Sequence, residues 1–226
     1  GMGRNVAYVQ KMAAQAGVEI THATGYYKEP FLPPECYTLT EQQLCDIMVK
    51  ELTEGMEGTG VRATVIGEIG TSKDITETEA KVFRAASRAH AETGAPICTH
   101  TTLGTRGLEQ LEIFKSFGVD LSRVVLSHID LSADLDYMKR LLDQGVNIAF
   151  DTIGKCNYQP DDSRADWLSR LCAEGYDTQI VMSMDITRRS NFADRGGVGY
   201  SYLLDTFAPL ASEAGVPDRA WENLLY

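Results

Sequence analysis

Apolar and polar positions along the chain follow two alternating patterns, one typical of buried strands and the other of amphipathic helices. Short runs rich in β-branched residues predict six strands, at residues 18–27, 62–70, 95–102, 123–130, 147–153 and 179–186. Helical periodicity surrounds them, at residues 5–16, 40–55, 76–94, 107–117, 132–145 and 164–174, and again from 200 and from 217 onward. This alternation predicts an α/β fold with a parallel sheet.

Short-range signals mark the ends of the predicted helices. Thr40 with Gln43, and Thr76 with Glu79, have the spacing of a capping box. Ser132 is expected to cap the helix that begins there, and glycines follow most of the helices, where a left-handed residue is common. Six strand–helix units in a row favour closure into a barrel. The 226 residues, taken as one domain, are slightly fewer than the ~250 of a typical eight-stranded α/β barrel.

The composition of the chain disfavours two classes of binding partner. The chain carries 21 basic and 32 acidic residues, a formal charge of −11, which disfavours binding to nucleic acid and to anionic membranes. No apolar run approaches the roughly 20 residues of a membrane span, and no signal-peptide pattern is present. Five scattered cysteines without a Cys-x-x-Cys pair indicate reduced thiols. We therefore expect a cytoplasmic protein that acts on a small molecule.

Acidic and imidazole side chains stand where several predicted strands end. Glu68, His100, His128 and Asp185 occupy such positions, and Asp151 lies at the same depth on the fifth strand. Because the carboxyl ends of barrel strands face one mouth, these side chains are expected to converge. Oxygen and imidazole donors suit zinc, manganese or a similar divalent ion, and such an ion can activate water for hydrolysis.

The same residues resemble a known family. Gly67-Glu68-Ile69-Gly70, Thr99-His100-Thr101, Ser127-His128-Ile129-Asp130, Asp151-Thr152-Ile153-Gly154-Lys155 and Met184-Asp185 resemble motifs of the phosphotriesterase family of the amidohydrolase superfamily, with the closest likeness to its bacterial homology proteins. The resemblance extends over essentially the whole chain. It implies a (β/α)8 barrel of the TIM type, of which about six units are present.

The resemblance also implies roles for these residues. Glu68 corresponds to the carboxylate that bridges two metal ions, and His100 and His128 to the ligands of the more exposed ion. Asp185 corresponds to a ligand that also accepts the proton of the attacking water. The implied reaction is attack of a metal-bound hydroxide on an ester, lactone or phosphoester. Thr152 and Ile153 replace the Arg-Tyr pair of the lactonase relatives, which argues against acyl-homoserine lactones.

One family motif is absent from this sequence. The His-x-His pair that holds the buried metal in relatives is not found, and the match begins after the second barrel strand. We therefore expect a partial barrel with at most one bound metal, most simply zinc, where intact relatives hold two. A homo-oligomer could complete such a barrel. The alternative is a truncated, catalytically impaired or inactive chain.

For several residues the sequence leaves two interpretations open. Asp185 could instead cap a helix, and Asp151 could orient a ligand or simply cap. Tyr26 and Tyr27 could line a substrate pocket or pack. Arg188 and Arg189 could bind an anionic substrate group, although neighbouring side chains diverge and one of the two is expected to be a solvated surface residue.

Overall fold

The computed structural model describes residues 4–225, and these form two compact units. The first unit comprises residues up to 102 together with 106–125, and the second comprises 103–105 together with residues from 126 onward. The strand β4 (Val124–Ser127) begins in the first unit and ends in the second. All six strands are ordered β1-β2-β3-β4-β5-β6, so neighbours in the sheet are also neighbours along the chain.

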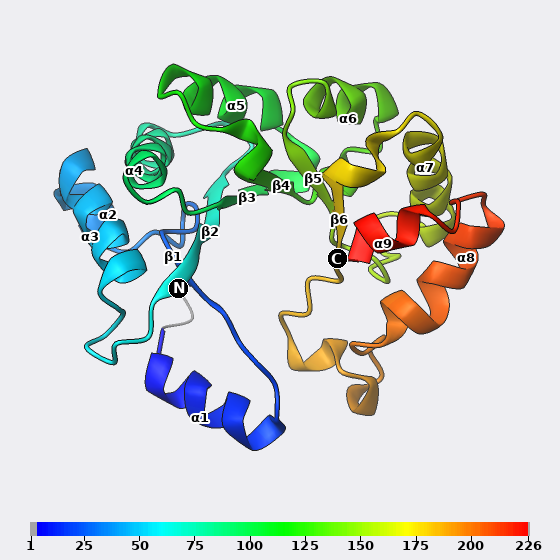
Figure 1. Cartoon of the computed structure of the whole chain (residues 1–226), viewed down its shortest axis with the longest axis horizontal. Coiled ribbons are helices and arrows are strands. Elements are labelled where there is room, and N and C mark those ends of the chain that lie inside the picture. Colours follow the sequence, from blue (N-terminus) through cyan, green and yellow to red (C-terminus); the bar gives the residue numbers. More distant parts are fainter. Residues whose placement is uncertain (1–3, 226) are drawn as a thin grey trace. The chain divides into compact units, whose positions relative to one another are not determined.

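The first unit alternates helices and strands. Its elements are α1 (Val6–Ala16), β1 (His22–Thr24), α2 (Glu35–Thr38), α3 (Glu41–Thr53), β2 (Ala63–Thr71), α4 (Glu77–Thr93), β3 (Ile97–Thr101) and α5 (Gly107–Ser116). The strands are parallel, with His22 beside Ala63 and Gly70 beside His100. In Figure 1, α3, α4 and α5 follow one another along one side of β2 and β3, and α1 lies apart from them. Phe83 and Phe114 stack between α4 and α5, with ring centroids 5.3 Å apart.

The second unit continues the same alternation. Its elements are α6 (Leu135–Leu142), β5 (Asn147–Phe150), α7 (Asp161–Ala173), β6 (Ile180–Met182), a π-helical turn (Leu203–Phe207), α8 (Ala208–Glu213) and α9 (Ala220–Leu225). β5 and β6 are parallel, with Phe150 beside Met182. Phe150 and Leu168 of α7 are both fully buried in its core. The predicted α/β class and parallel pairing are confirmed.

Both predicted capping boxes are present. Thr40 accepts from the backbone of Gln43, and Thr76 accepts from the backbone of Glu79, with the reciprocal side-chain bonds in place. The cap at Ser132 was wrong, because residues 129–132 form a short 3-10 turn and Asp134 caps α6 instead. Asp134 accepts a hydrogen bond from the Tyr137 backbone at 2.9 Å.

Several predicted strands are shorter than their apolar patterns indicated, two of them by more than half. The run at 18–27 contributes only His22–Thr24, because Val18 and Ile20 are exposed outside the sheet and Gly25 turns the chain with φ of 109°. The run at 179–186 contributes only Ile180–Met182. An apolar pattern therefore marked the place of each strand better than its length.

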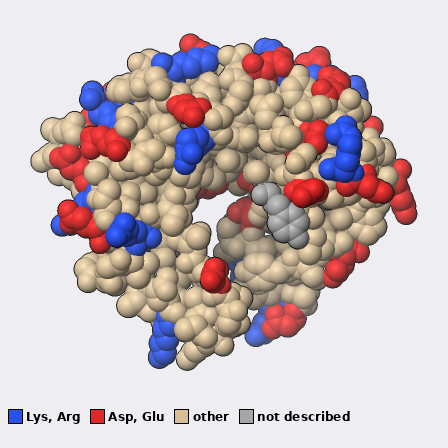
Figure 2. All heavy atoms as spheres, in the orientation of Figure 1, with Lys and Arg blue, Asp and Glu red and all other residues tan. Residues whose placement is uncertain are grey.

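The surface agrees with an acidic, mixed-charge protein. Figure 2 shows acidic and basic side chains interspersed on the face in view. Within residues 4–225, none of the helices combines the length and the apolar character needed to cross a bilayer.

Candidate metal centre

Glu68 and His100 lie together at the carboxyl ends of β2 and β3. The Nδ1 atom of His100 is 3.5 Å from a carboxylate oxygen of Glu68, and the two side chains are 12% and 33% exposed. Gly67 permits the close approach of β2 to the Cys98 backbone of β3, because a Cβ atom there would lie 2.2 Å from the carbonyl oxygen of Cys98. The first unit therefore presents one carboxylate and one imidazole side by side.

A buried glutamine supports the strand end that carries His100. Gln110 of α5 is fully buried and donates to the backbone oxygen of His100 at 3.0 Å and to the Thr71 hydroxyl at 2.8 Å. Its own oxygen accepts from the Thr99 hydroxyl at 2.7 Å. Gln110 was not predicted from the sequence, because a polar residue in an amphipathic helix gives no local sign that it faces inward.

The two neighbouring tyrosines have different surroundings. The Tyr27 hydroxyl lies 3.1 Å from Nδ1 of His100, and the two rings meet edge to face at 4.8 Å. Tyr26 lies near Glu35, Cys36 and Glu51. Burial raises the pKa of Tyr26, and the neighbouring Cys36, Glu35 and Glu51 raise it further. Tyr27 is thus the tyrosine that the structure brings to His100.

In the second unit, Asp151 holds His128. One Asp151 oxygen lies 2.8 Å from Nδ1 of His128 and also accepts from the His128 backbone at 2.9 Å. Both side chains are buried. A carboxylate at Nδ1 favours the tautomer whose lone pair is on Nε2, which is the usual arrangement behind a metal-ligating histidine. This geometry matches the orienting interpretation of Asp151.

Asp185 forms an ion pair with Lys155 in the same unit. Asp185 has φ of 44°, a left-handed conformation that is uncommon for a residue other than glycine. The first helical turn after β6 spans Arg189–Asn191 and has Arg188 at its N-cap, so Asp185 does not cap it. Arg188 and Arg189 are both exposed.

The second unit also contains a fully buried arginine. Arg164 of α7 donates to Asp130 at 2.7 Å, to Asp161 at 2.8 Å and to the Thr152 hydroxyl at 2.7 Å. It therefore joins the segments that follow β4 and β5 to the first turn of α7. The other Asp130 oxygen, Oδ1, is buried without a hydrogen-bond partner among the described residues. This network could not be predicted from the sequence, since its members are separated along the chain.

Glu68 and His100 in the first unit, and His128 in the second, are the potential metal ligands among the described residues. One carboxylate and two imidazoles are a donor set that zinc and similar divalent ions accept, with a coordination position left for water or substrate. The residues present therefore fit the predicted cation.

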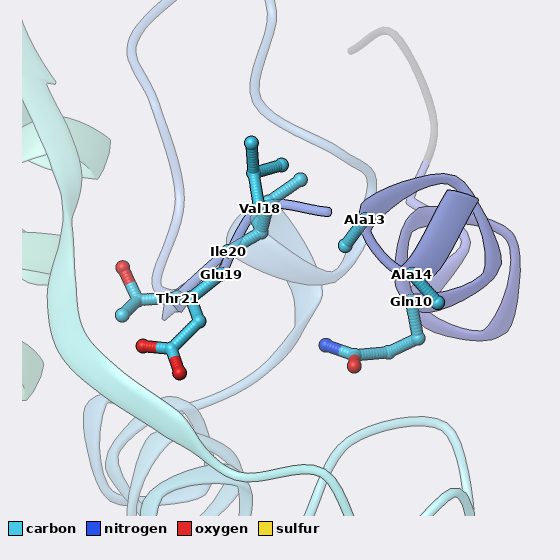
Figure 3. Close-up of a pocket in the computed structure, with 7 residues that line it drawn as sticks. All are labelled: Gln10, Ala13, Ala14, Val18, Glu19, Ile20 and Thr21. Carbon is cyan, nitrogen blue, oxygen red and sulfur yellow. The ribbon is translucent and has the colours of Figure 1, made fainter. Parts of the chain in front are cut away.

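A separate shallow pocket lies in the first unit. Figure 3 shows Gln10, Ala13 and Ala14 of α1 facing residues 18–21. Its volume is about 410 Å³, and none of the predicted site residues lines it. His22, at the start of β1, is buried and contacts Gln10 at 2.8 Å, which indicates a structural role for this histidine.

Comparison with known proteins agrees with the motifs. The sequence profile of the phosphotriesterase family matches residues 1–226. The phosphotriesterase homology protein of Escherichia coli is 45% identical over 215 residues, which cover 95% of this chain and 74% of that protein. An N-acetyltaurine hydrolase of Danio rerio is 32% identical over 237 residues, covering 100% of this chain and 68% of that protein.

Solved structures share the fold. The Escherichia coli phosphotriesterase homology protein, crystallised with phosphate in its active site, matches with a TM-score of 0.95 and 43% identity over 99% of this chain and 77% of that chain. A lactonase from Listeria monocytogenes matches with a TM-score of 0.90 and 29% identity over 98% of this chain and 75% of that chain. These matches confirm the TIM-barrel type of fold, with six of its strands present here.

Proposed function

The chain belongs to the phosphotriesterase family, and on that premise we propose that Glu68, His100 and His128 bind one divalent metal ion, zinc in the simplest case, for hydrolysis. Membership among relatives named as hydrolases and lactonases supports a phosphotriesterase-like hydrolase. The observation that carries the metal proposal is the Glu68 carboxylate 3.5 Å from Nδ1 of His100.

The hydrogen bonds around the donors support this assignment. Asp151 contacts Nδ1 of His128, Gln110 supports the backbone of His100, and Glu68 lies beside the His100 ring. An acidic side chain in an apolar strand is costly unless it is paired or bound to a cation, and Glu68 satisfies that condition in this arrangement. Each donor is thus held in place by a neighbour.

A bound divalent cation lowers the pKa of a water molecule and polarises the bond that is attacked. The protein supplies the remaining functions. Asp185 accepts the proton of the attacking water at its carboxylate, as the family pattern indicates. Asp151 keeps His128 in one tautomer, and the Tyr27 hydroxyl bonds to the His100 ring. One Asp185 oxygen is paired with Lys155 in this structure.

We propose an ester, lactone or phosphoester as the substrate. The relatives include a lactonase and an N-acetyltaurine hydrolase, so an amide belongs in the same test. A single metal ion is proposed because the donor set contains three residues and this sequence has no His-x-His pair. The second candidate function is a catalytically impaired barrel, which the missing His-x-His pair favours.

Turnover by the zinc-loaded protein tests the proposal. The substrates would be an aryl ester, a lactone, an aryl phosphoester and an N-acyl amide, each measured with and without a chelator. We expect at least one to be hydrolysed, and His100→Ala to lower kcat/KM by about 100-fold or more, because metal activation contributes several kcal/mol. His22→Asn is the matched control, as His22 contacts Gln10 rather than the ligand group.

Two results would count against the proposal. Equal turnover by wild type and His100→Ala would remove the metal assignment. Failure of the zinc-loaded wild type to hydrolyse any of the four substrates would favour the impaired-barrel alternative.

A further inference from the structure

We propose that Arg164 of α7 is a positioning residue for His128, and that it acts through the ends of β4 and β5. The inference rests on the proposed function, because His128 is one of the proposed metal ligands. His128 follows the last residue of β4, and Asp151, which holds its ring, follows the last residue of β5. Any contact that fixes these two strand ends therefore also fixes the imidazole relative to the carboxylate.

A second link joins the same two strand ends. Asp130 lies two residues beyond His128, and Thr152 lies one residue beyond Asp151. The Thr152 hydroxyl donates to Oδ2 of Asp130. Arg164 donates to the same Asp130 oxygen at 2.7 Å and to the Thr152 hydroxyl at 2.7 Å. Arginine, aspartate and threonine thus close a ring of three hydrogen bonds next to the contact between His128 and Asp151.

The guanidinium is also anchored to the start of its own helix. Its Nη1 atom donates to Asp161 at 2.8 Å and to the backbone oxygen of Gln159. Arg164 and Asp130 are fully buried, and Asp161 is nearly so. A planar guanidinium directs its donors at fixed angles, whereas the ammonium of a lysine is a point charge on a flexible chain. The fork of Arg164 therefore sets the positions of Asp130 and Thr152 relative to α7.

The backbone of His128 depends on contacts from outside its own turn. His128 has φ of 63°, a left-handed conformation that is uncommon for a residue with a side chain. Such a conformation persists where the surrounding structure imposes it. Asp151 accepts from the His128 N–H at 2.9 Å, and Arg164 holds Asp130 in the 3-10 turn that follows. The conformation of His128 is thus constrained at its own N–H and again two residues later.

The alternative role for Arg164 is a contribution to stability alone. Replacing a buried ion pair by apolar side chains of similar volume is often neutral or stabilising, so stability does not by itself explain a buried arginine. Buried ionic groups can instead select one conformation, and here the selected conformation is that of two strand ends. Arg170 on the same helix offers a contrast, because its pair with Asp166 is 3.7 Å long and the two side chains are 58% and 62% exposed.

Zinc affinity tests the inference, measured by competition with a chromophoric chelator. Arg164→Lys keeps the charge and removes the fork, and Thr152→Val removes the hydroxyl while keeping the shape. We expect each to weaken zinc binding by about tenfold or more, as loss of residues behind metal ligands commonly does. Thr152→Ser restores a hydroxyl and should stay within about threefold of wild type. Arg170→Lys is the matched control on α7 and should equal wild type.

The imidazole itself gives a second readout that a merely stabilising residue would not change. Long-range nitrogen–proton NMR spectra of zinc-free, 15N-histidine-labelled protein report the tautomer of each of the four histidines. His128→Gln identifies the His128 signals. We expect one tautomer in wild type, with the lone pair on Nε2, and a mixture in Arg164→Lys and Thr152→Val. The signals of His22 and His90 should be the same in all of these proteins.

A double-mutant cycle tests whether Arg164 acts through Asp151. Arg164→Lys would be combined with Asp151→Asn, and the zinc affinity compared with that of each single variant. Coupled residues give non-additive effects. We expect Arg164→Lys to weaken zinc binding by less than about threefold in the Asp151→Asn background. A tenfold loss in both backgrounds would overturn the inference, because Arg164 would then affect the metal by another route.

The remaining outcomes separate the inference from the proposed function. Zinc absent from wild type would overturn the proposed function, and with it the role given to Arg164. Zinc bound by wild type, with unchanged affinity or an unchanged His128 signal in folded Arg164→Lys and Thr152→Val, would overturn the inference alone, even if the melting temperature fell. If Arg164→Lys does not fold, the comparison of Thr152→Val with Thr152→Ser decides by the same two criteria.

Discussion

At the scale of single residues, the candidate chemistry depends on polar side chains that are held by other buried polar side chains. His128 is fixed through two hydrogen-bonding groups by one Asp151 oxygen. Gln110 connects the backbone of His100 with the hydroxyls of Thr71 and Thr99. Removing one partner of such a buried hydrogen bond destabilises the folded state, since the remaining polar group stays buried without a partner. The ligands should therefore respond strongly to changes in residues that touch no metal.

Asp151→Asn is the most direct substitution of this kind. It keeps the shape of the side chain but removes the charge that faces Nδ1 of His128. We expect zinc affinity to fall by about 10–100-fold, because carboxylates behind ligating histidines commonly contribute that much. Competition with a chromophoric chelator measures the change. Asp134→Asn is the control, because asparagine caps a helix as well as aspartate; equal affinities in the two variants would contradict the role given to Asp151.

At the scale of elements, a residue that caps a helix can also connect that helix to neighbouring segments. Glu79 completes the capping box of α4, yet it is fully buried and also accepts from the backbones of Glu29 and Ser72 and from the Ser72 hydroxyl. It thus ties the loop after β1 and the end of β2 to the start of α4. Thr40 and Gln43 form the same motif on an exposed surface, where it serves one helix only.

This difference predicts unequal effects of breaking the two boxes. Thr40→Ala should lower the free energy of unfolding by about 1 kcal/mol, the usual value of an N-cap. Glu79→Ala should cost several times more, because each buried donor left without an acceptor costs roughly 1–3 kcal/mol. Urea denaturation of both variants measures the ratio. Similar losses would mean that the extra bonds to Glu29 and Ser72 contribute little.

The sequence predicted these elements to different extents. Thr40, Thr76, Gly17 and Gly94 carry local signals, and all four act at helix ends as expected. The strand limits at 18–27 and 179–186 were wrong, because strand length depends on a partner strand that lies elsewhere in the chain. Arg164 was missed for the same reason: its burial follows from Asp130 and Asp161, which only the fold brings to it.

At the scale of the whole molecule, an acidic α/β chain with six parallel strands has the fold and the family of a phosphotriesterase-like hydrolase. Glu68, His100 and His128 were predicted from their positions at strand ends, since parallel strands bring those ends to one edge. Lys155 was outside that prediction, because a lysine after a strand has no distinctive spacing. We also propose that the chain self-associates. Sedimentation at several protein concentrations would measure its oligomeric state.

Zinc binding by the purified protein decides whether the proposed ligands hold a metal ion. Metal content after zinc loading and desalting would be measured for wild type, His100→Ala, His128→Ala and the control His22→Asn, with circular dichroism to confirm folding. We expect one equivalent of zinc in wild type and in His22→Asn, and a loss of zinc affinity of at least about 100-fold in the two ligand variants. Zinc retained equally by folded His100→Ala and His128→Ala, or two equivalents in wild type, would contradict that expectation.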